Sequence, residues 1–79
     1  MTRHTRNIPE YVLDNLDRLK EERRKSGLTS GRLAGLLGVT TTTVLHYEED
    51  LMMPQRNIYN RMAKLFGWEV WNNDESKNY

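Results

Sequence analysis

The sequence predicts a single small all-α domain, and three observations lead to that prediction. The chain has 79 residues, of which 37% are hydrophobic and 29% charged, a balance that suits one globular domain with a modest core. Apolar residues recur at spacings of three and four, which is the period of a helix with one buried face. Threonines stand where helices would need N-caps, and glycines stand where helices would end. We therefore expect a compact fold of four helices, with five as the alternative.

The composition also excludes several classes of protein. No apolar run approaches the ~20 residues of a membrane span, and the opening MTRHTRNIPE lacks the apolar region of a secretory signal. The chain has no cysteine, which excludes disulfides and thiolate metal sites. A cytoplasmic protein is the simplest interpretation.

The net charge of +1 is distributed unevenly along the chain. Residues 1–32 carry eight Lys/Arg against five Asp/Glu, and residues 33–79 carry four against six. Basic residues supply much of a protein's affinity for nucleic acid by neutralising phosphates. Binding of DNA would therefore need a local basic patch or more than one copy of the chain.

Residues 7–27 predict the first helix. Asn7 is a suitable N-cap, Pro9 fits the first turn, and Glu10 lies three residues after the cap. Gly27 would end the helix. The face expected to be buried has spacings of three and four and consists of Val12, Leu16, Leu19 and Arg23.

Two short helices with matching caps follow. Thr29 as N-cap places Leu28 and Leu33 in the positions of a hydrophobic staple, and Thr40 as N-cap does the same for Val39 and Val44. Gly38 lies between the two helices, where a tight turn is expected. The four threonines at 40–43 also leave a β-strand or a linker open. A helix is favoured because the apolar residues do not alternate beyond Thr43 and no other segment has strand character.

A loop and a last helix complete the predicted fold. Pro54 disfavours helix at Met53, so the segment EEDLMMPQR is expected to be a loop. Residues 57–67 predict a helix that Gly67 stops, with an apolar face of Ile58, Met62, Leu65 and Phe66. The remaining tail begins with the apolar residues Trp68, Val70 and Trp71 and ends with polar residues.

Ala34, Gly38 and Val44 stand in the frame A-x3-G-x5-V of a helix-turn-helix. A small residue at 34 lets the second helix pack closely, and Gly38 permits a left-handed turn. The chain resembles the Cro/CI-type (XRE) helix-turn-helix family. The matching segments span roughly residues 12–68 and are Arg23, GLTSGRLAGLLGVT, YEEDLMMP and MAKLFG.

The resemblance implies a lambda-repressor-like domain over residues 8–71, between a flexible arm at 1–7 and a disordered polar tail at 72–79. Residues 30–37 would be the supporting helix and 41–49 the recognition helix. Arg23 would form a structural pair with Glu48. The chain departs from the family's pattern at three places: Ser30 replaces a glutamine, Gly31 and Gly35 lie inside the supporting helix, and Asp50 replaces a glycine.

The resemblance also assigns candidate contacts with DNA. Thr41, Thr42 and His46 are expected to reach base edges, since a threonine methyl can contact a thymine methyl. The alternative for all three is plain exposure to solvent, and His46 has no credible partner for a metal site. The candidate phosphate contacts are Ser30, Arg32, Thr40, Thr43, Gln55 and Arg56. The alternatives are that Thr43 turns toward the core and that Arg56 is a solvated charge. Arg3 and Arg6 would form either a minor-groove arm or a disordered terminus.

Four large apolar residues leave two interpretations open. Met52, Met53, Trp68 and Trp71 would either close the core or form a dimer contact, because a domain this small has little core in which to bury them.

The sequence therefore predicts a homodimeric protein that binds double-stranded DNA sequence-specifically and regulates transcription. A repressor of phage or mobile-element type is favoured. The alternative is a protein-interaction module on the same fold, such as an antitoxin-like or anti-repressor partner. No catalytic arrangement, cofactor motif or small-molecule site is predicted, so the chain is not expected to be an enzyme.

Overall fold

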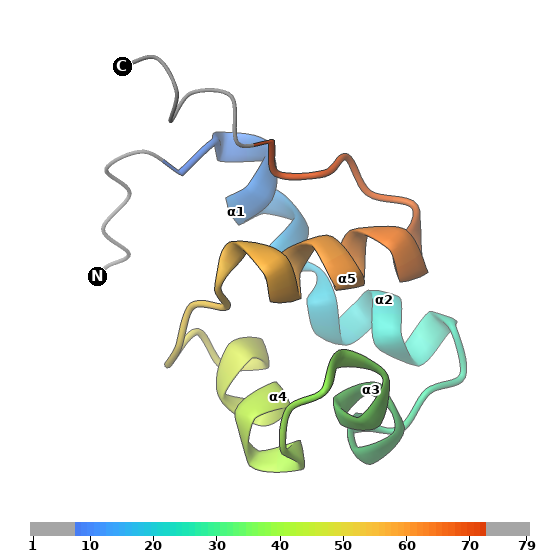
Figure 1. The fold of residues 1–79 in the computed structure, drawn as a ribbon. Coiled ribbons are helices and arrows are strands. Elements are labelled where there is room, and N and C mark those ends of the chain that lie inside the picture. The colour runs from blue at the N-terminus through green and yellow to red at the C-terminus, as the bar shows by residue number, and fades with distance from the viewer. Residues whose placement is uncertain (1–7, 73–79) are drawn as a thin grey trace.

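Five α-helices make up most of the chain that the computed structural model describes, residues 8–72. They are α1 (Glu10–Asp17), α2 (Leu19–Lys25), α3 (Ser30–Leu37), α4 (Thr41–Glu48) and α5 (Arg56–Phe66), and no strand occurs within 8–72. In Figure 1, α3 and α4 lie together on one side of α5, whereas residues 68–72 run back along its other side toward α1. The predicted all-α class is confirmed, with five helices.

Several of the predictions concern the two ends of the chain. Residues 1–7, which include Arg3, His4, Arg6 and Asn7, lie outside the described residues, as do residues 73–79 of the polar tail. Across residues 8–72, no helix has both the length and the apolar character needed to span a bilayer.

The single helix predicted for residues 7–27 is instead two helices that meet at Arg18. The first begins at Glu10, with Pro9 as its N-cap. The Arg18 N–H donates to the carbonyl of Asn15 at 3.0 Å, three residues back, and this tight turn ends α1. The Asn15 side chain is buried, and its amide donates to the hydroxyl of Tyr59 on α5 at 3.0 Å. This contact joins residues 44 positions apart, so no local pattern could have predicted it.

The two threonine caps are present as predicted, and Thr41–Glu48 is a helix rather than a strand or a linker. Thr29 Oγ1 accepts from the N–H of Arg32 at 3.0 Å, and Thr40 Oγ1 accepts from the N–H of Thr43 at 3.1 Å. Each bond satisfies one of the orphan donors at a helix start. The helix that follows Thr40 ends at Glu48, one residue earlier than expected.

All five helices contribute to one core. Its buried residues are Val12, Leu16, Leu19, Leu33, Ala34, Leu37, Val44, Tyr47, Tyr59, Met62, Ala63 and Trp71. The predicted apolar face of α5 was partly wrong, because Leu65 is 43% exposed whereas Tyr59 and Ala63 are buried. The cause is the tail, since the Tyr59 ring packs against the rings of both Trp68 and Trp71.

Residues 68–71 are fastened to α1 and α5 through their backbone. The Tyr59 hydroxyl donates to the Glu69 carbonyl at 2.9 Å, and the Tyr11 hydroxyl donates to the Val70 carbonyl at 2.8 Å. The Asn60 side chain pairs with the backbone of Trp71, accepting from its N–H at 2.7 Å and donating to its carbonyl at 3.2 Å. We call residues 68–71 the C-terminal strap. Within it, Trp71 is buried and Trp68 is partly buried against the core, so both indoles take part in closing the core.

Candidate nucleic-acid interface

The turn between α3 and α4 is fixed by a glycine and by an arginine from α5. Gly38 has φ +79°, a left-handed conformation that side chains disfavour. Arg61 Nη1 donates to the Leu37 carbonyl at 2.7 Å, and a Cβ added at Gly38 would lie 3.0 Å from that same nitrogen. Position 38 therefore needs glycine for its backbone conformation and has little room for a side chain. Sequence reasoning missed this role of Arg61, because the contact is not local.

The two helices of this turn pack as the A-x3-G-x5-V frame predicts. Ala34 is 3% exposed, while Leu33 and Val44 are fully buried and Tyr47 is 8% exposed. These residues hold the axis of α4 against α3, so that the opposite side of α4 faces solvent.

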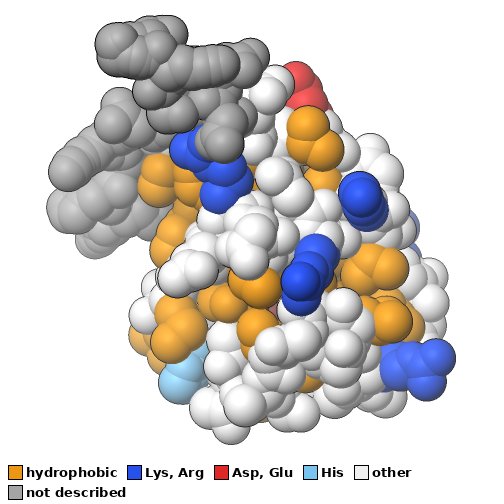
Figure 2. All heavy atoms as spheres, viewed as in Figure 1, with side chains coloured by type: hydrophobic (Ala, Val, Ile, Leu, Met, Phe, Trp, Pro, Cys, Tyr) orange, Lys and Arg blue, Asp and Glu red, His pale blue; other side chains and the backbone are white. Residues whose placement is uncertain are grey.

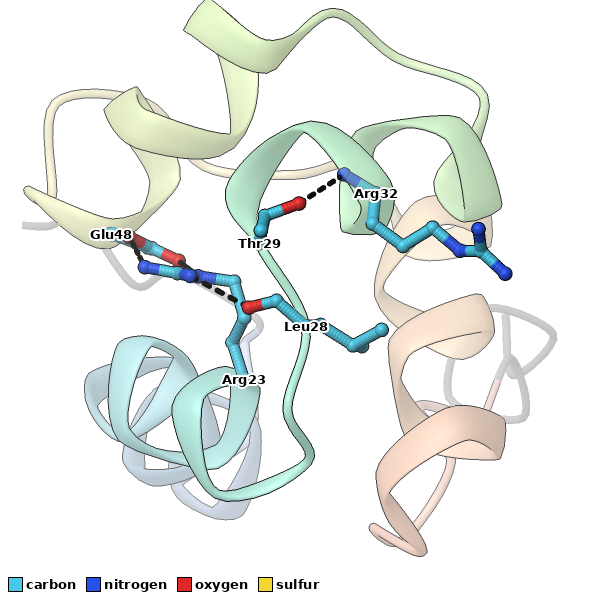
Figure 3. A network of polar contacts seen from close by, with 5 residues as sticks. All are labelled: Arg23, Leu28, Thr29, Arg32 and Glu48. Atoms are coloured by element: carbon cyan, nitrogen blue, oxygen red, sulfur yellow. Dashed lines mark hydrogen bonds and ion pairs between the residues drawn. The ribbon is translucent and has the colours of Figure 1, made fainter.

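The predicted pair between Arg23 and Glu48 is present and ties α2 to the end of α4 (Figure 3). Arg23 Nε donates to Glu48 Oε2 at 2.6 Å and Nη2 to Oε1 at 3.3 Å, in the two-pronged geometry that suits a guanidinium and a carboxylate. Arg23 Nη1 also donates to the Leu28 carbonyl at 2.9 Å, which holds the segment before α3. The Arg23 and Glu48 side chains are only 12% and 2% exposed, so this pair is well shielded from water.

The predicted base-reading residues lie on the outer side of α4. Thr41 and Thr42 are exposed, and His46 is partly buried. Leu45 shares this side, because it follows Thr41 by four residues and Thr42 by three, and it is 40% exposed. The sequence prediction omitted Leu45, although the same spacing rule would have placed it there.

Thr40 and Thr43 keep one hydroxyl hydrogen for an outside partner. Their two Oγ1 atoms are 2.8 Å apart, and one hydroxyl donates to the other. The two residues have two hydroxyl hydrogens between them, and this bond uses one. The second can be donated to an external acceptor such as a phosphate oxygen, so the cap and a phosphate contact are compatible.

The other predicted phosphate contacts differ in their surroundings. Arg32 is exposed, and its guanidinium extends away from the Arg23–Glu48 pair (Figure 3). Ser30 is half-buried in the first turn of α3, and Gln55 is exposed at the N-cap of α5. The Arg56 guanidinium lies over the Trp71 ring, 4.9 Å from its centroid, so a cation–π contact holds it against the strap.

Acidic residues are missing from the segments that build this face. No Asp or Glu occurs between Glu22 and Glu48 or between Asp50 and Glu69, whereas Arg32, Arg56, Arg61 and Lys64 fall within those stretches. Figure 2 shows Lys and Arg side chains over the face with α3, α4 and α5, and acidic side chains only at its edge. The net charge of +1 therefore conceals a local surface on α3 and α5 whose charged side chains are all basic, bordered by the exposed Glu49 and Asp50 after α4.

The three acidic residues that end this stretch have separate roles. Glu48 is paired with Arg23, and Glu49 is the exposed C-cap of α4. Asp50 has φ +63°, so it adopts the left-handed conformation for which glycine is usual. Aspartate tolerates this conformation better than most residues. The turn is closed by the Leu51 N–H, which donates to the His46 carbonyl at 2.9 Å.

Two observations concern chemistry other than binding. Among residues 8–72, no group of three or more His, Asp or Glu could hold a metal ion. Burial raises the pKa of the Tyr47 and Tyr59 phenols, with the hydrogen bond from Asn15 acting in the opposite direction at Tyr59. Both phenols are therefore uncharged at neutral pH.

Comparison with known proteins agrees with this geometry. Residues 17–69 match the model of a family described as a helix-turn-helix domain. The chain belongs to the helix-turn-helix domain family. A relative from Thermococcus gammatolerans, named "Putative HTH-type transcriptional regulatory protein", is 39% identical over 56 residues. The aligned part is 71% of this helix-turn-helix chain but 18% of the relative, so the chain spans less than a fifth of that protein's length. No solved structure matches the chain.

Proposed function

We propose that this helix-turn-helix chain is a sequence-specific DNA-binding regulator of transcription, of the Cro/CI type (XRE family), that acts in the cytoplasm. The observation that carries the proposal is the exposed outer side of α4, which the Arg23–Glu48 pair holds in place and which lies beside α3, a helix without acidic residues. A rigid helix of this kind can enter the major groove while surrounding cations contact the phosphates. The name of the Thermococcus gammatolerans relative supports the same role.

Within this proposal, α4 reads bases through Thr41, Thr42 and His46. Arg32 is the main phosphate contact, because its side chain is exposed on α3, the helix that packs against α4. The remaining proposed phosphate contacts are Ser30, Thr40, Thr43, Gln55 and Arg56.

We further propose that the chain acts as a homodimeric repressor. The contact between copies is assigned to the segment after α4, where Leu51 is 68% exposed and Met52 is 46% exposed. Met53 and the two indoles of the strap lie closer to the core, so they would contribute less. A second copy would double the cationic surface, which suits a chain of low net charge.

The test is the salt dependence of binding. A fluorescent random-sequence duplex should bind with an affinity that falls steeply as salt rises, since phosphate contacts release counterions. Arg32→Ala should lower the slope of log K against log salt by roughly one. Arg24→Ala, which removes an exposed arginine from α2, outside the proposed interface of α3 and α4, should leave the slope unchanged. An affinity for the duplex that does not change with salt concentration would contradict the proposal.

A second candidate function has one observation in its favour. Glu49 and Asp50 are exposed directly before Leu51 and Met52, which gives an acidic and apolar surface suited to a protein partner with basic and apolar groups. In that case the chain would be an antitoxin-like or anti-repressor module. It would form a stoichiometric complex with that partner and show no salt-dependent affinity for DNA.

A further inference from the structure

The outer side of α4 lacks the side chains that most often identify guanine and adenine. Specific contacts to guanine use arginine or lysine, and those to adenine use asparagine or glutamine, because these groups form paired hydrogen bonds with the base edge. None of these four residue types occurs between Val39 and Asp50. The helix offers instead the hydroxyls of Thr41 and Thr42, the imidazole of His46 and, at its end, the carboxylate of Glu49.

The same side of α4 is rich in methyl groups. Leu45 is 40% exposed, and it lies one turn beyond the methyl-bearing side chains of Thr41 and Thr42. The hydroxyls of Thr40 and Thr43 are turned into the cap by their mutual bond, so they do not compete for this surface. The exposed part of α4 therefore presents an apolar strip, edged by hydroxyls, between Thr41 and Leu45.

The major groove contains one apolar group that such a strip could recognise. Among the base edges there, only thymine carries a methyl group, at C5. An apolar side chain in contact with that methyl removes both from water, which favours thymine over cytosine at the contacted position.

We propose that Leu45 is a specificity-determining residue that reads thymine 5-methyl groups, together with the methyls of Thr41 and Thr42. The preferred operators then carry thymines at the positions that face α4, and they are distinguished by shape and methyl contacts rather than by paired hydrogen bonds to guanine. This inference rests on the proposed function, since it names the base chemistry that the same helix recognises.

Single exposed leucines are common on protein surfaces, so the control must be another exposed leucine. Leu65 is 43% exposed on α5 and is outside the proposed reading surface. Leu65→Ala and Leu45→Ala remove the same atoms at nearly the same exposure, and both variants should keep the parent melting temperature within a few degrees. A difference between them in DNA binding therefore reports on position rather than on lost apolar area.

The experiment starts from a random-sequence duplex pool, from which the full chain selects its tightest duplex. That duplex is then resynthesised with each thymine replaced in turn by deoxyuridine, which removes only the 5-methyl group. Affinities of the parent, Leu45→Ala and Leu65→Ala chains are measured for every duplex. At one to three thymines, the parent and Leu65→Ala should lose about fourfold in affinity per methyl, the value of one buried carbon. Leu45→Ala should bind thymine and uracil duplexes equally at one of those positions or more.

The outcomes separate the inference from the function that it deepens. If the selected duplex binds in a salt-dependent way but no thymine-to-uracil change affects the parent, the inference is wrong and the DNA-binding function stands. The same holds if Leu45→Ala is as sensitive to the methyl groups as the parent at every position. If the parent selects no duplex and binds none with salt dependence, the proposed function itself fails.

Discussion

At the scale of single residues, Arg23 connects three segments that are separate in the sequence. Its guanidinium contacts the carboxylate of Glu48 at the end of α4 and the carbonyl of Leu28 before α3. The side chains of this pair are only 12% and 2% exposed. Breaking a buried ion pair costs much more stability than breaking an exposed one. Removal of one partner would leave the other charge buried and unpaired.

Arg23→Ala is therefore expected to destabilise the fold by about 3 kcal/mol or more, as measured by urea denaturation. The matched control is Lys25→Ala, which breaks a 3.7 Å pair with Glu22 in which the lysine is 66% exposed. Exposed pairs of this kind contribute little, so the control should unfold like the parent. Equal unfolding midpoints for both variants would show that the buried pair is not needed.

The run of threonines separates into residues that cap and residues that face solvent. Thr40→Ala removes the oxygen that accepts from the Thr43 N–H, and we expect a loss of ~1 kcal/mol in stability. Thr42 makes no such bond and is exposed, so Thr42→Ala should leave the melting temperature nearly unchanged and alter the preference among DNA sequences. Identical melting temperatures for the two variants would contradict the assignment of Thr40 as the cap.

At the scale of elements, a glycine inside α3 and the glycine that caps its end have different conformational requirements. Gly35 lies inside the helix with no atom within 4 Å of where a Cβ would stand, whereas Gly38 has φ +79° and Arg61 Nη1 at 3.0 Å. Gly35→Ala should therefore stabilise the protein by up to about 1 kcal/mol, because glycine lowers helix propensity by that amount. Gly38→Ala should destabilise it by at least ~1 kcal/mol. Thermal unfolding of the two variants, with midpoints on opposite sides of the parent's, is the expected result, and shifts in the same direction would refute it.

The elements also show which parts of the fold the sequence could predict. The caps at Thr29 and Thr40 and the turn at Gly38 depend on residues within four positions, and the sequence pattern located all three. The break at Arg18 and the true buried face of α5 depend on Asn15, Tyr59 and the strap, which are far apart in the chain. The pattern of apolar residues selected Leu65 and omitted Tyr59, because tyrosine carries a polar hydroxyl. In the structure that hydroxyl is hydrogen-bonded to Asn15 and to the Glu69 carbonyl, so the Tyr59 ring can be buried.

The candidate site also combines contacts that could be expected from the sequence with contacts that could not. The Arg23–Glu48 pair, though not local, was expected because the family resemblance supplied it. Neither that resemblance nor periodicity indicated the Arg61–Leu37 bond or the Arg56–Trp71 contact. Both depend on how α5 and the strap pack against the rest of the chain.

At the scale of the whole molecule, the strap joins the first and last elements. It receives hydrogen bonds from Tyr11 on α1 and from Tyr59 on α5, and the Trp71 indole is only 8% exposed. The fold of residues 8–72 is thus closed by a segment without regular structure.

Trp71→Ala should consequently cost about 3 kcal/mol or more in stability, as expected for a large buried ring. Val70→Ala is the control, because Val70 is 45% exposed and its carbonyl keeps the bond from Tyr11. Chemical denaturation of the two variants checks this. A Trp71→Ala variant as stable as Val70→Ala would mean that the strap does not hold the domain together.

The central claim is that the surface of α3 and α4 binds DNA, and amide chemical-shift mapping with an isotope-labelled chain tests it most directly. Addition of a random-sequence duplex at low salt should shift the amides at the start of α3 and along α4, around Arg32, Thr41, Thr42 and Leu45. The amide signals of α1 and of the exposed side of α2 should not shift. Shifts confined to α1 and α2, or no shifts at any DNA concentration, would contradict the claim.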